Sequence, residues 1–225
     1  DWYLAANIKS KNNLSEHLLK GLKVDGVPKL LKKTIYPFMY NDFKTLKKIV
    51  KDHNIGIIKM EVIRYDMPKN NFLIKIRELA NKNNIILIFD ECTSGFRQTF
   101  GGIHKMFGVN PDLLVLGKAL GNGYAITAVL GREGIMDNIK NTFISSTFWT
   151  ERIGPSAALK TLEIMEKEKS WKKITKIGKY IIQNWKKIAN KHKLKIKVRG
   201  IPAFCSFIFL IKNNNIYKTF ITQEM

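Results

Sequence analysis

An acid and an amine each follow a short apolar run in this chain of 225 residues. The run at 85–89 leads directly into Asp90 and Glu91, and the run at 113–116 is followed, after one glycine, by Lys118. Because burying an unpaired carboxylate is costly, Asp90 must either reach solvent or face a cation. A lysine amine can form a covalent bond with a carbonyl carbon, and a nearby carboxylate can keep a ring nitrogen protonated. These two groups could therefore act together on a carbonyl compound.

The elements expected around these groups alternate between strand and helix. Short apolar runs, typical of buried strands, occupy residues 56–60, 85–89, 113–116 and 125–131. Apolar residues at helical spacing predict an amphipathic helix over 71–83. The alternation predicts an α/β fold with a mostly parallel sheet. Ligands of such sheets bind beyond the carboxyl ends of the strands, so we expect Asp90 and Lys118 to point into one crevice.

The carboxyl-terminal third has a different pattern. A helix is expected over 156–167, followed by a lysine-rich amphipathic helix, and strands are expected at 195–198 and 204–211. We therefore predict a large domain over 1–155, and connecting helices with the start of a smaller domain over 156–225.

Two phosphate-binding motifs can be excluded around Lys118. A nucleotide phosphate loop has a glycine five residues before its Gly-Lys pair and a hydroxyl residue directly after it, but Asp112 and Ala119 occupy these positions. The dinucleotide-binding fingerprint fails because Ile126 stands where a third glycine should follow the pair at 121 and 123.

Pyridoxal phosphate fits the acid and the amine better than a nucleotide does. This cofactor needs a lysine near its carbonyl carbon, glycines that let the backbone approach, and an acid against its ring nitrogen. Each residue alone also has an ordinary structural interpretation. Lys118 could be a surface lysine among 39 lysines and arginines, and Asp90 could cap a helix.

The formal net charge of +21 favours an alternative function, that of a basic, non-enzymatic protein that binds nucleic acid or an anionic surface. A lysine-rich composition spread over solvated helix faces explains the same charge, and no nucleic-acid recognition motif is present. The four histidines and two cysteines show no metal-ligand spacing, so no metal site is expected. The sequence has no membrane-spanning run or secretory signal, and the lack of paired cysteines favours a reducing, cytoplasmic location.

The segment at 89–123, FDECTSGFRQTFGGIHKMFGVNPDLLVLGKALGNG, resembles the core of the class-III (subgroup-II) aminotransferases. It is especially similar to the glutamate-1-semialdehyde 2,1-aminomutases and their aminotransferase relatives. The Asp-Glu pair, Gly-Phe-Arg, Gly-Gly, Pro-Asp and Leu-Gly-Lys motifs occur together in order, and STFWTERIGPSAAL at 146–159 extends the match. The resemblance implies the large domain of a fold-type I transferase and the start of its smaller α+β domain.

The resemblance also assigns roles to individual residues. Lys118 matches the Schiff-base lysine and Asp90 matches the partner of the pyridine nitrogen. Cys92 stands where the family usually has a valine packed on the cofactor ring. Thr147 matches the hydroxyl residue that reaches the cofactor phosphate of the neighbouring subunit, which implies a homodimer with shared active sites. Glu61 matches the glutamate of a family Glu-Pro pair, but valine replaces the proline, and no chemistry is assigned to it.

The activity implied is pyridoxal-phosphate-dependent amino-group transfer, by an aminotransferase or an aminomutase. The partners would be a small-molecule amino donor and a keto or aldehyde acceptor, with no specific nucleic acid and no membrane. The family's glycine-rich loop for the cofactor phosphate lies upstream of the matching region. We therefore expect the chain to be an internal fragment that is inactive in isolation.

Overall fold

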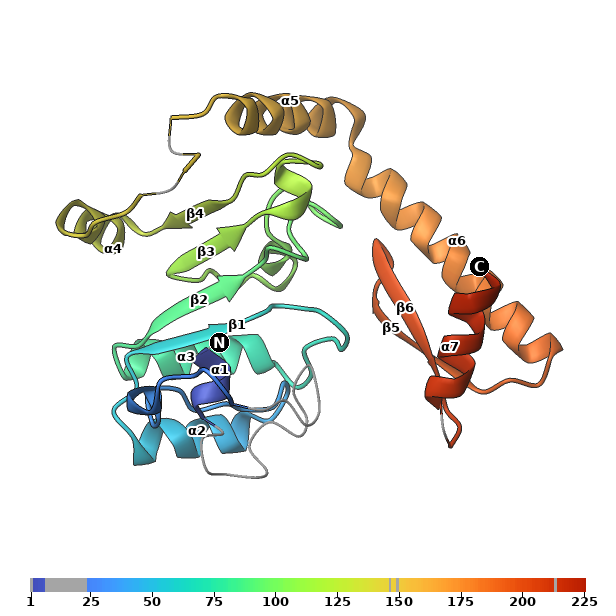
Figure 1. Cartoon of the computed structure of the whole chain (residues 1–225), viewed down its shortest axis with the longest axis horizontal. Helices are drawn as coiled ribbons and strands as arrows, with labels where there is room; N and C mark the ends of the chain where they lie inside the picture. Colours follow the sequence, from blue (N-terminus) through green and yellow to red (C-terminus); the bar gives the residue numbers. More distant parts are fainter. Residues whose placement is uncertain (1, 7–23, 146, 149, 213) are drawn as a thin grey trace. The chain divides into compact units, whose positions relative to one another are not determined.

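A computed structural model describes residues 2–6, 24–145, 147–148, 150–212 and 214–225 (Figure 1). The chain divides into two compact units, Asp1–Ile55 and Gly56–Met225. The first unit contains α1 (Trp2–Ala5), the 3-10 helix η1 (Lys29–Leu31) and α2 (Phe43–Asp52). Helix α2 begins at a side-chain cap, because a carboxylate oxygen of Asp42 accepts a hydrogen bond of 3.0 Å from the backbone N–H of Thr45.

The second unit is built on one four-stranded sheet. Its strands are β1 (Ile57–Met60), β2 (Ile86–Asp90), β3 (Leu113–Leu116) and β4 (Ala128–Gly131). They lie side by side in the order β1-β2-β3-β4, as Figure 1 shows. The first three strands are parallel and β4 is antiparallel to β3. The prediction of an α/β fold with a mostly parallel sheet is confirmed.

Helix α3 (Phe72–Lys82) covers one face of this sheet and contacts β2. Its buried side is formed by Phe72, Leu73, Ile76 and Ala80. Fully burying a large apolar side chain contributes roughly 1.5–3 kcal/mol, so this face supplies much of the core. The opposite face is more open, since Ile57 is 55% exposed whereas its neighbour Ile58 is 3% exposed. The helix predicted over 71–83 is confirmed.

One buried carboxylate ties the start of β3 to its neighbours. Asp112 is 3% exposed, and its carboxylate accepts hydrogen bonds from Leu87 N (2.8 Å), Arg77 (2.8 Å) and Arg132 (2.9 Å). Burial by itself would raise the pKa of Asp112, but these hydrogen bonds, first that from Leu87 N and then those from Arg132 and Arg77, outweigh it and lower the pKa below the usual value. This carboxylate therefore joins α3, β2 and the end of β4.

We expect Asp112→Asn to lower the free energy of unfolding by about 1.5–3 kcal/mol near neutral pH, because charge-assisted hydrogen bonds to buried donors are lost. The folded pKa of Asp112 lies below the unfolded value, so its contribution is complete above about pH 5 and is lost as the pH falls. Urea unfolding of both proteins at several pH values measures the difference. If the difference in free energy of unfolding between the wild type and Asp112→Asn does not decrease below about pH 4, the lowered pKa of Asp112 is wrong.

In the described part of the chain, four short helices lie between β2 and the carboxyl-terminal part, before and after the strands β3 and β4. They are η2 (Ile103–Phe107), η3 (Lys118–Leu120), α4 (Glu133–Met136) and η4 (Asp137–Asn141). Two long helices follow, α5 (Ile153–Glu168) and α6 (Ser170–Lys191), and then the antiparallel strands β5 (Ile196–Ile201) and β6 (Phe204–Phe209) and helix α7 (Asn214–Glu224). Helix α6 lies against the turn between β5 and β6, since a Cβ built on Gly178 would lie 1.8 Å from the carbonyl oxygen of Pro202. The predicted domain boundary between 155 and 156 stays a prediction.

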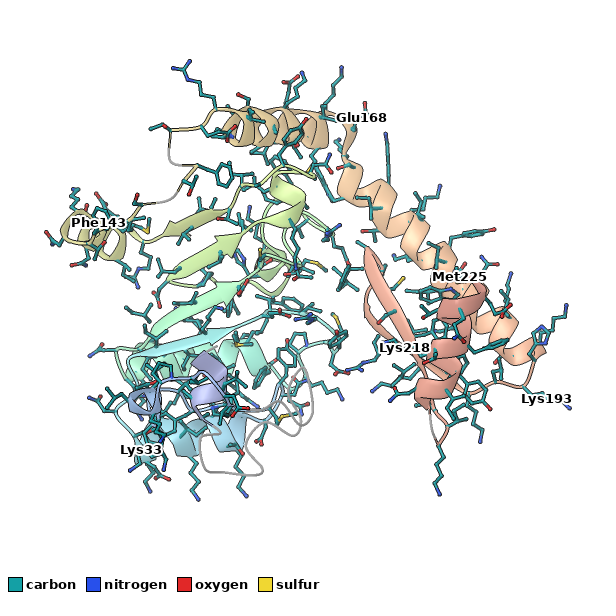
Figure 2. All side chains as sticks on the ribbon, viewed as in Figure 1. Lys33, Phe143, Glu168, Lys193, Lys218 and Met225 are labelled. Atoms are coloured by element: carbon teal, nitrogen blue, oxygen red, sulfur yellow. The ribbon has the colours of Figure 1, made fainter. Side chains whose placement is uncertain are left out.

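Many lysine side chains of the described part of the chain are exposed. Figure 2 shows Lys33, Lys193 and Lys218 as sticks that stand out from the ribbon, and each is exposed. No helix in the described ranges is both long and apolar enough to cross a membrane.

Candidate active site

The acid and the amine lie at the carboxyl edge of two adjacent parallel strands. Asp90 is the last residue of β2 and pairs in register with Val115 of β3. Lys118 begins the short helix η3, two residues after the end of β3. Parallel strands end at the same edge of a sheet, so the pairing brings both side chains to one side of the unit.

Lys118 is held in an unusual backbone conformation, and its amine bonds a neighbouring hydroxyl. Its φ is 44°, in the left-handed region, and the preceding Gly117 is extended. The side-chain amine donates a hydrogen bond of 2.6 Å to the hydroxyl oxygen of Thr93, which lies in the turn after β2. Lys118 as a whole is exposed, while its hydrogen bond to the buried Thr93 is partly buried.

Asp90 has a partner for each of its carboxylate oxygens. Oδ1 accepts a hydrogen bond of 3.2 Å from the backbone N–H of Cys92, and Oδ2 forms an ion pair of 2.9 Å with the amine of Lys59 from β1. Of the two alternatives that the sequence left open for Asp90, solvent or a cation, the structure shows a cation, Lys59, beside a partly exposed carboxylate. The Asp90 side chain is 26% exposed, which leaves its carboxylate within reach of a further ligand.

The adjacent Glu91 points the other way and is fully buried. Its carboxylate accepts hydrogen bonds from the backbone N–H groups of Ile103 and His104, from His104 Nδ1 at 2.7 Å, and from the hydroxyl of Ser94 at 3.3 Å. A carboxylate with this many donors can be buried without a large penalty. Glu91 therefore fastens the loop after β2 to the helix η2.

Cys92 lies directly behind the lysine loop. A Cβ built on Gly117 would be 2.6 Å from Cys92 Sγ and 3.2 Å from the methyl group of Thr127, so only glycine allows this close approach. The thiol of Cys92 is free and half-buried. Cys92 thus contacts the residue that precedes Lys118, which is consistent with a packing role at the site.

The pKa of Glu61, directly after β1, is affected by the charges of Asp90 and Lys118. Burial raises the pKa of Glu61, Arg64 opposes this shift through an ion pair of 3.1 Å, the charge of Asp90 adds to it and the charge of Lys118 opposes it. Both Asp90 and Lys118 are therefore close enough to Glu61 to act on its ionisation.

Of the four predicted site residues, the structure brings together three. Asp90, Cys92 and Lys118 share the edge of β2 and β3, whereas Thr147 lies in an exposed turn between η4 and α5. Their roles toward a cofactor stay predictions. Among the described residues, no group of three or more histidine, cysteine, aspartate or glutamate side chains could hold a metal ion.

Sequence reasoning missed Lys59 and Thr93 at this edge, and it missed the anchoring role of Glu91. Lys59 interrupts an apolar strand, which could have marked it as a residue facing a charge. Thr93 and the anchoring role of Glu91 carry no such signal, because their partners are 25 and 13 residues away in the sequence. Together the site presents an amine, a fixed carboxylate and a hydroxyl, which can bind a carbonyl compound that also carries a protonated nitrogen.

Comparisons with known proteins point to one family. The family described as "Aminotransferase class-III" matches residues 39–224. The chain is 37% identical over 207 residues to the 3-aminobutyryl-CoA aminotransferase of Cloacimonas acidaminovorans, covering 88% of this chain and 50% of that protein. It is 31% identical over 193 residues to the glutamate-1-semialdehyde 2,1-aminomutase of Methanocaldococcus jannaschii, covering 82% of this chain and 45% of that protein. The chain thus spans about half the length of these curated relatives.

Solved structures give the same result for the fold. The pyridoxal-phosphate internal aldimine form of the FumI protein of Sphingopyxis sp. MTA144 is similar with a TM-score of 0.78 at 23% identity, over 82% of this chain and 46% of that chain. Ornithine aminotransferase of Plasmodium yoelii is similar with a TM-score of 0.68 at 29% identity, over 76% of this chain and 48% of that chain.

Proposed function

Since this chain belongs to the class-III aminotransferases, we propose that it supplies the amine and the acid for pyridoxal-phosphate-dependent amino-group transfer, by an aminotransferase or an aminomutase. One observation supports the proposal: Asp90 ends β2 and Lys118 follows β3, so the amine and the carboxylate lie at the same edge of the sheet. The residues fit the cofactor chemically, because it requires an amine for its aldehyde and an acid for its ring nitrogen.

Each residue has a separate task. Lys118 Nζ would hold the cofactor by condensing with its aldehyde, with loss of water, and as a free amine it would serve as the general base and then the general acid that moves a proton. The hydroxyl of Thr93 orients this amine. The carboxylate of Asp90, which accepts a hydrogen bond from Cys92 N, would lie against the ring nitrogen and keep it protonated. The cofactor, when bound, supplies the electron-withdrawing ring that stabilises the substrate carbanion.

The partners in this proposal are a small-molecule amino donor and a keto or aldehyde acceptor. The names of the relatives support this breadth, since one is an aminotransferase and another an aminomutase. We further propose a homodimer in which Thr147, an exposed residue, reaches the cofactor phosphate of the neighbouring subunit. A large domain over 1–155, the start of a smaller domain over 156–225 and a cytoplasmic location complete the proposal. The free thiols of Cys92 and Cys205 are consistent with a reducing location.

The test is to trap the cofactor on the chain. The protein is incubated with millimolar pyridoxal phosphate, reduced with borohydride and digested, and the peptides are weighed by mass spectrometry. We expect the peptide that contains Lys118 to be labelled well above those with other exposed lysines such as Lys105. A high cofactor concentration is used because we expect weak anchoring of the phosphate. Labelling spread evenly over the lysines would overturn the proposal.

The alternative function, a basic protein that binds nucleic acid or an anionic surface, receives no support from the comparisons. Its test is the salt dependence of binding to a duplex oligonucleotide, since contacts to phosphates release counterions. We expect weak binding with no preference among sequences.

A further inference from the structure

The carboxylate of Asp90 already has a cation in this chain. Lys59 Nζ lies 2.9 Å from Asp90 Oδ2, while Oδ1 accepts the hydrogen bond of 3.2 Å from Cys92 N. Both oxygens of Asp90 are therefore occupied by donors from the protein itself. Each oxygen can accept a second hydrogen bond, but a protonated ring nitrogen on Oδ2 would bring a second positive charge next to the Lys59 ammonium group, and the two cations would compete for the carboxylate.

The position of Lys59 makes this ion pair a built feature of the sheet. Lys59 belongs to β1 and is in register with Ile88 of β2. Side chains two residues apart in a strand point to the same face, so Lys59, Ile88 and Asp90 share one face of the sheet. The neighbours of Lys59 in the strand are all apolar, and its side chain is 60% exposed. Its ammonium group can therefore move into solvent at a small cost in free energy, whereas the carboxylate of Asp90 is also held by the hydrogen bond from Cys92 N.

We propose that Lys59 is a positioning residue that competes with the cofactor for Asp90. The proposal rests on the function proposed above. Without cofactor, the ammonium group of Lys59 holds the carboxylate in place and neutralises it. When the cofactor binds, the protonated ring nitrogen takes the place of that ammonium group on Oδ2, and Lys59 moves to solvent. The exchange breaks one ion pair and forms another, and no covalent bond changes.

The exchange has a measurable effect on affinity. Part of the attraction between the ring nitrogen and Asp90 is offset by the loss of the pair with Lys59. Ion pairs with this degree of exposure contribute little, so removing Lys59 should tighten cofactor binding by about two- to fivefold. The effect should depend on the ring nitrogen, because only that atom competes for Asp90.

The experiment compares two ligands on three proteins. Pyridoxal phosphate and its deaza analogue, which has C–H in place of the ring nitrogen, are titrated into wild type, Lys59→Met and Lys59→Arg, with binding followed by absorbance. We expect Lys59→Met to bind pyridoxal phosphate about two- to fivefold more tightly than wild type and to bind the analogue no better. Lys59→Arg keeps the cation and should behave like wild type. Lys75→Met, which changes an exposed lysine of α3, is the matched control and should leave both affinities unchanged.

Two results of these titrations would overturn the proposal. One is that Lys59→Met changes the affinity for both ligands equally, and the other is that it changes neither affinity. Lys59→Gln provides a second variant, with the same expectations, should the methionine variant fold poorly by circular dichroism. The two proposals fail separately: if wild type is labelled at Lys118 after borohydride reduction but the ligand difference is absent, only the role of Lys59 is wrong. If wild type is not labelled at Lys118, both are wrong.

Discussion

In the longer protein that we expect to contain this chain, Lys118→Arg should reduce amino transfer by at least about three orders of magnitude, because the variant loses both the covalent attachment of the cofactor and the proton carrier. Arginine keeps the positive charge and the approximate length of the side chain, but its guanidinium group stays protonated and cannot attack an aldehyde. The measurement is the decay of pyridoxal phosphate absorbance at high protein concentration after a panel of amino acids and primary amines is added. Borohydride should also fail to fix the cofactor on the 118 peptide.

The matched control for this prediction is Lys105→Arg. Lys105 is an exposed lysine whose amine hydrogen-bonds Phe100 O at 3.4 Å, so the same exchange there should leave the rate unchanged. A small primary amine added to Lys118→Ala should restore part of the rate, since it can carry the proton in place of Nζ. A purely structural lysine would give no such rescue. Undiminished transfer by Lys118→Arg would remove this residue from the chemistry.

Glu91→Ala is expected to lower the free energy of unfolding by roughly 3–5 kcal/mol, because it leaves several buried donors without their acceptor. Those donors are the backbone N–H groups of Ile103 and His104, the His104 ring and the Ser94 hydroxyl. In a chain of this length each kcal/mol corresponds to about 2–4 °C in melting temperature, so a decrease of roughly 10 °C is expected. Thermal unfolding followed by circular dichroism measures it.

The control for Glu91 is Glu78→Ala in α3. Glu78 is exposed, and surface substitutions usually change stability by less than about 0.5 kcal/mol. Glu91→Gln keeps one acceptor oxygen, so its melting temperature should lie between those of the wild type and Glu91→Ala. If the melting temperature of Glu91→Ala lies within about 2 °C of the wild-type value, the loop after β2 is held by other contacts.

The sequence was sufficient to predict the strands because their apolar runs are short and sharply bounded. The run at 113–116 became β3 with the same limits, and the helix expected over 71–83 is α3. The direction of β4 could not be predicted, since periodicity does not distinguish a parallel from an antiparallel neighbour. Its expected start at 125 was also early, because β4 begins at Ala128.

The candidate site was predicted in part. Asp90 ends a strand and Lys118 follows the next strand by two residues. Ligands of α/β sheets bind beyond the carboxyl ends of the strands, so both residues were expected at one edge. The pair between Lys59 and Asp90 depends on which strand lies next to β2, and that is set by long-range pairing. The same holds for the hydrogen bond between Lys118 and Thr93. The roles of Asp90, Lys118, Cys92 and Thr147 toward a cofactor await the experiments above.

The left-handed backbone at Lys118 lowers the stability of the loop at the same position that carries the amine. A side chain with a Cβ at φ of 44° carries a conformational penalty on the order of 1 kcal/mol, which glycine would largely avoid. A glycine there would therefore relax the loop and remove the amine at once. The proposed nucleophile therefore lies at a position whose backbone conformation costs free energy, so contacts elsewhere in the unit must hold Lys118 in place.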